Sequence, residues 1–391
     1  MYTQESLAPE DELLLLLVRG QCPPEIQEQA CGLLGQELSW SHILRQARTH
    51  EVFPLLYRNL QTLDFLGVPN VVRAELETAC RMTALGNALL VRELQQVLRL
   101  LGEAGVPVMP LKGVALADSL YDDITLRVCG DSDILVPHAM VPQAFHLLLG
   151  RGYTAEFTEQ FFADLLLSST IEYTLAREGR GFCYLLDLHW GMLWGPRWDG
   201  GAAEDLWAEA RPHGCFGVPA YTLSPEWEFL FLATHATRHR WQGLKWLVDI
   251  HEVCCQRQID WENVQEKTER LGWEEVVRLT LSICHTLFDT PLPAQFPLRE
   301  LPPWLQLFPN DPSLRSWQHA LLPLYLLKRP SDRIRYALGD LLVPTLAERQ
   351  CLHLPFPLLP FYYPLRPLRL GYKWGWRLVL AGLQRLGLAR H

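Results

Sequence analysis

Two aspartates stand one residue apart at the start of an apolar run in the middle of the chain. The run Gly130–Val136 has the pattern of a turn glycine followed by a strand, with Asp131 and Asp133 at its beginning. Side chains on a strand alternate between its faces, so both carboxylates are expected on one face. Neighbouring carboxylates repel each other, and a divalent cation with oxygen ligands removes the repulsion. The pair therefore predicts a metal site, with a solvent-facing turn as the alternative.

A third carboxylate lies inside the apolar run Tyr184–Trp190. A charge in such a run needs a partner or a metal. Alternation places Asp187 and His189 on one face and the leucines on the other. Three carboxylates on two neighbouring strands would hold two metal ions for in-line displacement at phosphorus. His189 is then expected to orient a metal ligand, or the molecule to which the phosphorus group is transferred. The alternative is a surface strand with an alternating pattern.

Upstream, residues 108–116 predict a strand, a Lys-Gly turn and the start of a helix. The free N–H groups of such a turn suit a phosphate, and Lys112 before Gly113 adds a positive charge. Arg127 precedes Asp131 by four residues. We expect Arg127 either to contact a triphosphate or to form a structural salt bridge.

A polar stripe follows the apolar stretch 227–253. Its members recur at three- and four-residue steps and therefore share a helix face; they are His235, Arg238, His239, Gln242, Lys245, Trp246 and Asp249. We expect the stripe to line the site, with Arg238 or Lys245 near phosphates and the aromatic residues near the base or the acceptor. A polar seam between domains is the alternative.

The elements that must position these residues predict an α+β protein with a small mixed-sheet core between two helical regions. Residues 1–104 show helical periodicity, most clearly over 75–103. Residues 105–225 carry strand-length runs at 106–111, 132–136, 173–176 and 184–189, with helix-like stretches at 114–120 and 140–149. Residues 226–348 are again helical, including 227–255, and residues 349–391 form a basic tail rich in proline and aromatic residues.

Composition excludes several classes of protein. With 391 residues, 49% hydrophobic and 20% charged, the chain is too apolar for intrinsic disorder. A net charge of −9 argues against a dedicated nucleic-acid binder. The ten cysteines include no Cys-x-x-Cys pair, which argues against a zinc site and favours a reducing cytoplasm. The leucine run at 13–17 follows acidic residues, so we expect a buried helix and not a signal peptide.

The charge is unevenly distributed. Seven Lys and Arg residues and no Asp or Glu lie from Arg349 onward, which leaves a net charge of −16 on residues 1–348. Residues 365–386 mix basic and aromatic side chains as an interfacial helix does. We therefore expect either a weak contact with a membrane surface or a helix that docks on the acidic body.

Taken together, these motifs resemble the nucleotidyltransferase superfamily typified by DNA polymerase beta, and in particular its bacterial family of uncharacterised nucleotidyltransferases. The matching motifs are Leu-Lys-Gly at 111–113, Arg-x-x-Gly-Asp-x-Asp at 127–133, Gly-Tyr at 152–153 and Asp-Leu-His-Trp at 187–190. The likeness extends outward to Ala-x-x-His-x-Val at 47–52, His-x-x-x-His-x-Trp at 235–241 and Leu-Lys-Trp-Leu-x-Asp at 244–249, and so covers most of the chain.

The resemblance implies that Asp131, Asp133 and Asp187 bind two Mg²⁺ or Mn²⁺ ions and carry the catalysis. The expected reaction moves a nucleoside monophosphate from an NTP to a hydroxyl or similar acceptor on a small molecule, peptide or protein, and releases pyrophosphate. The residues expected to bind the nucleotide, or to support its binding, are Lys112, Gly113, Arg127, His189, Arg238 and Lys245.

Two departures from the superfamily pattern stand out. Val114 follows Gly113 where the superfamily has serine, so Lys112 must replace the hydroxyl, and the 18 residues from Gly113 to Asp131 exceed the usual spacing. A nucleotide-binding or partner-binding protein without catalysis is therefore an alternative. An Asp-x-Asp glycosyltransferase is a weaker one, because the preceding hundred residues are helical where that fold places a βαβ half.

Overall fold

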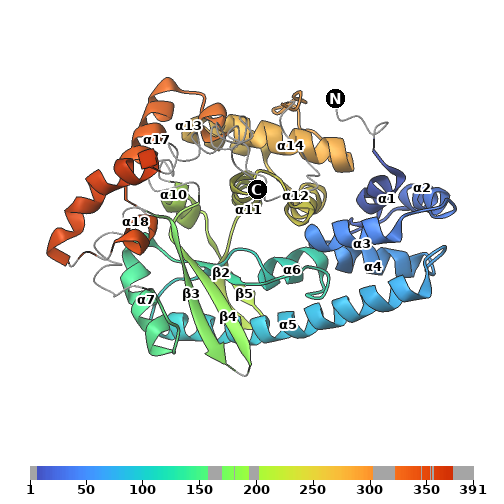
Figure 1. Ribbon diagram of the computed structural model, residues 1–391, viewed down its shortest axis with the longest axis horizontal. Coiled ribbons are helices and arrows are strands. Elements are labelled where there is room, and N and C mark those ends of the chain that lie inside the picture. The colour runs from blue at the N-terminus through green and yellow to red at the C-terminus, as the bar shows by residue number, and fades with distance from the viewer. Residues whose placement is uncertain are drawn as a thin grey trace, which may run out of the picture.

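The computed structural model describes residues 7–156, 170–179, 181–192, 202–302, 322–344, 346–352, 354 and 356–372. Within them the chain forms a four-stranded mixed sheet and a two-stranded hairpin, with helices before and after (Figure 1). The predicted α+β fold is confirmed.

The N-terminal part is helical, as predicted. Its helices are α1 (Pro9–Leu17), α2 (Pro24–Leu34), α3 (Trp40–Thr49), α4 (Phe53–Thr62) and α5 (Asn70–Glu103). The leucine run is buried in α1, and three acidic residues occupy the first turn, where the helix dipole favours them. The long helix α5 runs beneath the sheet in Figure 1.

The main sheet has the strand order β1-β2-β4-β3. Its strands are β1 (Met109–Pro110), β2 (Ser132–Leu135), β3 (Glu172–Gly179) and β4 (Phe182–His189). The central strands β2 and β4 are parallel, and the other two pairs are antiparallel. The predicted helices of this region are α6 (Val114–Tyr121) and α7 (Val141–Gly150). All four predicted strands are present, although the first shortens to two residues.

The two faces of the sheet differ as the alternation predicted. Ile134, Leu186 and Leu188 are fully buried in one hydrophobic cluster with residues of α5 and α7. The opposite face carries Asp133 and Asp187. A sheet with an apolar face on its core and a polar face toward a cleft follows directly from this pattern.

The C-terminal helices are α11 (Pro225–Arg238), α12 (Leu244–Gln256), α13 (Trp261–Leu271) and α14 (Glu274–Phe288). The stretch 227–255 is thus two helices, because Arg240 and Trp241 have left-handed φ angles of 59° and 55° that end the first. Buried residues of α1, α3 and α4 share one hydrophobic cluster with residues of α11, α12 and α14. Helices from both ends of the chain therefore form one core beside the sheet.

A hairpin of β5 (Arg211–Cys215) and β6 (Val218–Thr222) follows α10 (Ala202–Ala208) and was not predicted. Its two-residue turn is Phe216-Gly217, with φ angles of 49° and 75°. Turns of this type usually carry Asn-Gly or Asp-Gly. The usual sequence signal for the hairpin was therefore missing.

The remaining elements are α16 (Leu322–Leu326), α17 (Pro330–Leu342), α18 (Leu346–Cys351), and two 3₁₀ segments, η2 (His138–Met140) and η4 (Phe356–Phe361). The predicted surface helix 365–386 lies within the described residues only as far as 372. There Arg366 and Arg369 form ion pairs with the buried Glu348. No helix in the described parts of the chain is long and apolar enough to span a membrane.

A buried ion pair connects the core to α12. The Arg127 guanidinium lies 3.0 Å from Asp249 Oδ2, and Tyr121 Oη donates a hydrogen bond to Asp249 Oδ1 at 2.9 Å. The side chains of Arg127 and Asp249 are only 4% and 1% exposed. This matches the structural salt bridge that the sequence allowed for Arg127.

Asp249→Ala should lower the free energy of unfolding by about 3–5 kcal/mol, because it leaves Arg127 buried without a counter-ion. The double variant Arg127→Met/Asp249→Leu should lower the free energy of unfolding by clearly less, since no unpaired charge remains. Glu51→Gln, which breaks an exposed ion pair with Lys245, should cost less than about 1 kcal/mol. Urea unfolding measures all three. A loss for Asp249→Ala as small as that for Glu51→Gln would contradict the anchoring role of the buried pair.

Candidate active site

A cavity of about 350 Å³ lies between the polar face of the sheet and helices α11 and α12. We call it the main cleft. Its lining residues are Glu51, Lys112, Arg127, Gly130, Asp131, Glu172, Asp187, His235, Arg238, His239, Lys245 and Trp246. Six of the nine predicted site residues are among them. Asp133 and His189 are buried and contact lining residues, and Gly113 precedes α6.

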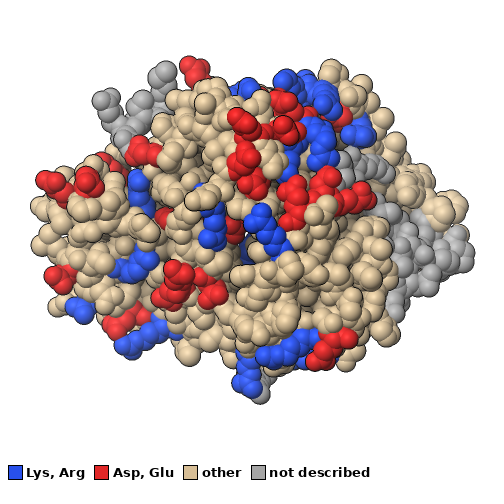
Figure 2. Space-filling model, turned by 180° about the vertical axis from the view of Figure 1, so that it is seen from behind, with Lys and Arg blue, Asp and Glu red and all other residues tan. Residues whose placement is uncertain are grey.

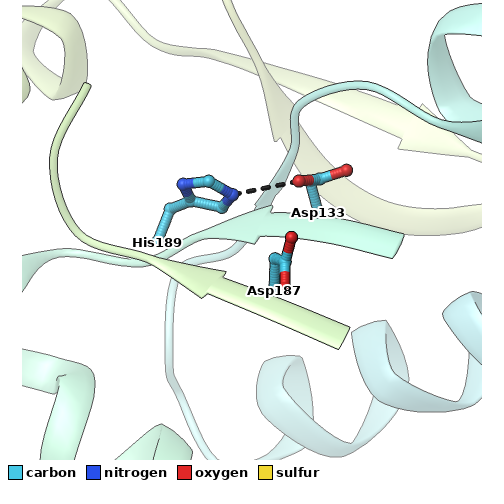
Figure 3. Close-up of side chains that lie close together, drawn as sticks. All are labelled: Asp133, Asp187 and His189. Carbon is cyan, nitrogen blue, oxygen red and sulfur yellow. Dashed lines mark hydrogen bonds and ion pairs between the residues drawn. The ribbon is translucent and has the colours of Figure 1, made fainter. Parts of the chain in front are cut away.

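Asp133 and Asp187 lie directly opposite each other on the parallel strands β2 and β4. One ligand atom from each of Asp133, Asp187 and His189 lies within 4.8 Å of the other two (Figure 3). Asp131 is outside this group and lies on the wall of the main cleft. Carboxylate oxygens are common ligands of divalent cations, and an imidazole beside them can bind the ion or orient a carboxylate ligand. The geometry therefore places a candidate metal site at the predicted strand pair.

The protonation of the two aspartates is set by different neighbours. Burial acts to raise the pKa of Asp133, but Lys112 and His189 outweigh it and hold that pKa well below its usual range. Burial and the nearby Asp133 charge raise the pKa of Asp187. Asp133 Oδ2 is buried and accepts no hydrogen bond from the described residues. A buried carboxylate oxygen that accepts no hydrogen bond and lies near a second carboxylate is suited to coordinate a cation.

Lys112 approaches the same carboxylate from the turn after β1. Its Nζ lies 2.5 Å from Asp133 Oδ1, and the two side chains are 9% and 0% exposed. Gly113 adopts a left-handed φ of 66°, and a Cβ there would lie 3.1 Å from the carbonyl oxygen of Asp131. The Lys-Gly turn thus has the expected place beside the aspartates. Its lysine, however, contacts Asp133 and is not free in the cleft.

Every lysine and arginine of the main cleft has a carboxylate partner. The pairs are Lys112 with Asp133, Arg127 with Asp249, Arg238 with Glu172, and Lys245 with Glu51. Among the described residues, Asp131 and Asp187 form no ion pair. Two of the six carboxylates named here, Asp131 and Asp187, thus have no lysine or arginine beside them in an ion pair. The residues present fit a metal.

Glu172 is a site residue that the sequence interpretation missed. It lies opposite His189 on β3, and His189 Nδ1 is 3.1 Å from Glu172 Oε2. Burial opposes ionisation, but Arg238 and His189 lower the pKa of Glu172 to about 2. Alternation in residues 171–175 places Glu172 on the same face as Thr174, which donates a hydrogen bond to Asp187 Oδ1 at 2.5 Å. The predicted strand began at 173 and so excluded Glu172.

The polar stripe divides between the cleft and the interior. Five of its seven members line the main cleft: His235, Arg238, His239, Lys245 and Trp246. Burial lowers the pKa of His235 well below its usual value, and nearby cations add to the shift. Asp249 instead faces Arg127 in the buried pair. One stripe therefore both lines the main cleft and supplies a buried ion-pair partner.

These features define an α+β protein with a candidate metal site of carboxylates beside a cleft that carries both basic and acidic side chains. The chain belongs to the family described as uncharacterised nucleotidyltransferases, whose model matches residues 36–289, more than half of the chain. This is the family that the sequence motifs resemble. No curated protein matches the chain.

Lys112→Met should bind Mn²⁺ about tenfold more tightly than the unaltered protein in the absence of nucleotide, a change of about 1.4 kcal/mol. The reason is that the Lys112 ammonium and a divalent ion compete for the Asp133 carboxylate. Electron paramagnetic resonance of free Mn²⁺ measures the affinity.

Lys245→Met is the matched control, because Lys245 pairs with Glu51 and not with a candidate ligand. It should change Mn²⁺ affinity little. Unchanged or weaker Mn²⁺ binding by Lys112→Met would show that Lys112 does not compete with the metal.

Proposed function

We propose that the protein transfers a nucleoside monophosphate from an NTP to a hydroxyl or similar acceptor, with release of pyrophosphate. The observation that carries the proposal is the pairing of Asp133 with Asp187 on neighbouring parallel strands, beside a cleft lined by lysine and arginine. Family membership supports the same class of reaction.

Asp133 and Asp187 would hold two Mg²⁺ or Mn²⁺ ions together with Asp131 at the cleft wall. When bound, such ions lower the pKa of an attacking hydroxyl and neutralise the triphosphate. His189 fixes Asp133 through a 3.0 Å contact from Nε2, while its Nδ1 contacts Glu172. A ligand held this way keeps its orientation. The raised pKa of Asp187 suits a group that accepts the proton of the acceptor hydroxyl.

The triphosphate would be bound by exchange of ion pairs. Lys112, Arg238 and Lys245 line the cleft and each contacts a carboxylate. Phosphate oxygens offer the same charge-assisted hydrogen bonds. The first N–H groups of α6, next to Gly113, have no partner within the helix and would take the place of the missing serine hydroxyl.

The acceptor is proposed to be a small molecule, a peptide or a protein. On the face shown in Figure 2, lysine and arginine are interspersed with aspartate and glutamate and form no continuous basic surface. A nucleic-acid duplex would need such a surface. The net charge of −16 on residues 1–348 also argues against a nucleic acid as the acceptor.

Incubation with each α-³²P-labelled NTP and cell extract should label an acceptor, and intact-mass analysis should show a gain of one nucleoside monophosphate. Asp133→Asn and Asp187→Asn should each reduce labelling by about 10²–10³-fold, because both remove charge from the site of transfer. Asp64→Asn makes the same chemical change at an exposed turn between α4 and α5 and should leave labelling unchanged.

Two outcomes would overturn the proposal. Labelling that persists in both aspartate variants would place the chemistry elsewhere. A mass gain of a single phosphate would identify a kinase. Nucleotide binding without any transfer would instead support the non-catalytic alternative, which the valine after Gly113 keeps open.

A further inference from the structure

A second cavity of about 190 Å³ adjoins the main cleft, and we call it the side pocket. The two cavities share Glu51, His239, Lys245 and Trp246 as a common wall. The side pocket lies where the end of α3 meets the connection between α11 and α12. The two cavities are therefore adjacent, and one extended ligand could contact both.

Some polar side chains of the side pocket have partners within the chain and others do not: His50 accepts from the Leu244 N–H, and Glu51 pairs with Lys245. The Thr49 hydroxyl, the Gln242 amide and the His239 imidazole form no hydrogen bond with the described part of the chain, and neither does the Trp246 indole N–H. The one lysine of the side pocket, Lys245, is paired with Glu51, so the groups left for a ligand there are uncharged. Burial, helped by Arg238, lowers the pKa of His239 to about 4. At neutral pH its ring thus offers one donor and one acceptor without a charge.

The wall of the side pocket is held in place by packing. The rings of His239 and Trp246 lie 4.3 Å apart between centroids with an angle of 30° between their planes. A Cβ at Gly243 would lie 2.7 Å from an atom of the Trp246 ring, so the indole packs directly on the glycine backbone. The Lys245 backbone N–H donates to the carbonyl of His50 at 3.3 Å and joins the two chain segments. The part of the wall formed by His239 and Trp246 is therefore preorganised.

The side pocket thus offers uncharged donors and acceptors beside aromatic rings, and its only lysine, Lys245, is paired with Glu51. Such groups suit a neutral planar heterocycle better than a phosphate, which needs cations or helix N-termini. In a nucleotide, that heterocycle is the base. We infer that the side pocket binds the nucleobase of the NTP while the triphosphate lies in the main cleft. The inference rests on the proposed function and adds the location of base recognition to it. Gln242, Thr49 and His239 would contact the edge of the base.

The test compares two probes in the presence of Mg²⁺ by isothermal titration calorimetry: the best-binding NTP and inorganic tripolyphosphate. The unaltered protein should bind the NTP at least about tenfold more tightly. Gln242→Ala and His239→Ala should each weaken the NTP about five- to tenfold and leave tripolyphosphate unchanged. Gly243→Ala should also weaken NTP binding, because the added Cβ would displace the Trp246 ring. Gln265→Ala on α13, a residue that lines neither cavity, is the control and should change neither affinity.

Several results would overturn the inference. Equal affinity of the unaltered protein for the NTP and for tripolyphosphate would show that the base contributes nothing to binding. Equal weakening of both probes by Gln242→Ala and His239→Ala would indicate a change in the main cleft. Variants that bind the NTP normally but lose transfer would assign the side pocket to the acceptor. If neither probe binds to the unaltered protein, the proposed function itself fails, and this result is distinguishable from the others.

Discussion

Two carboxylates held opposite each other on adjacent parallel strands are the constraint around which the rest of this structure is arranged. Asp133 and Asp187 are fixed by strand register, and their backbone cannot separate without breaking the centre of the sheet. Like charges this close in a buried place are unfavourable unless cations balance them. The ammonium of Lys112 pairs with Asp133, and the ring of His189 contacts the same carboxylate. The charge that remains explains why the site fits a divalent ion.

The fold places the partners of these carboxylates by long-range packing. Helices from the N-terminal and C-terminal parts share one hydrophobic cluster, so Glu51 from the end of α3 meets Lys245 at the start of α12. The break between α11 and α12 brings His239 and Trp246 to the wall between two cavities. Both cavities thus depend on contacts between segments almost two hundred residues apart. The two cavities therefore form only when these distant segments have packed together.

Local patterns in the sequence predicted the part of the site that depends on periodicity. Alternation along residues 130–136 and 184–190 predicted the polar and apolar faces of β2 and β4, and the order of motifs predicted the family. The pairing of Lys112 with Asp133 was not predictable, because it depends on how the turn after β1 lies against β2. Glu172 was missed because its strand begins one residue earlier than the apolar run suggested. The β5–β6 hairpin was missed because Phe-Gly replaces the usual turn residues.

The most direct measurement is an anomalous difference map at the manganese edge, from crystals grown with Mn²⁺ and a non-hydrolysable NTP analogue. The account predicts a peak within coordination distance of carboxylate oxygens of both Asp133 and Asp187. It also predicts that Lys112 has left Asp133 for a phosphate oxygen. A bound nucleotide with the Lys112–Asp133 contact intact and no peak between the two aspartates would contradict it.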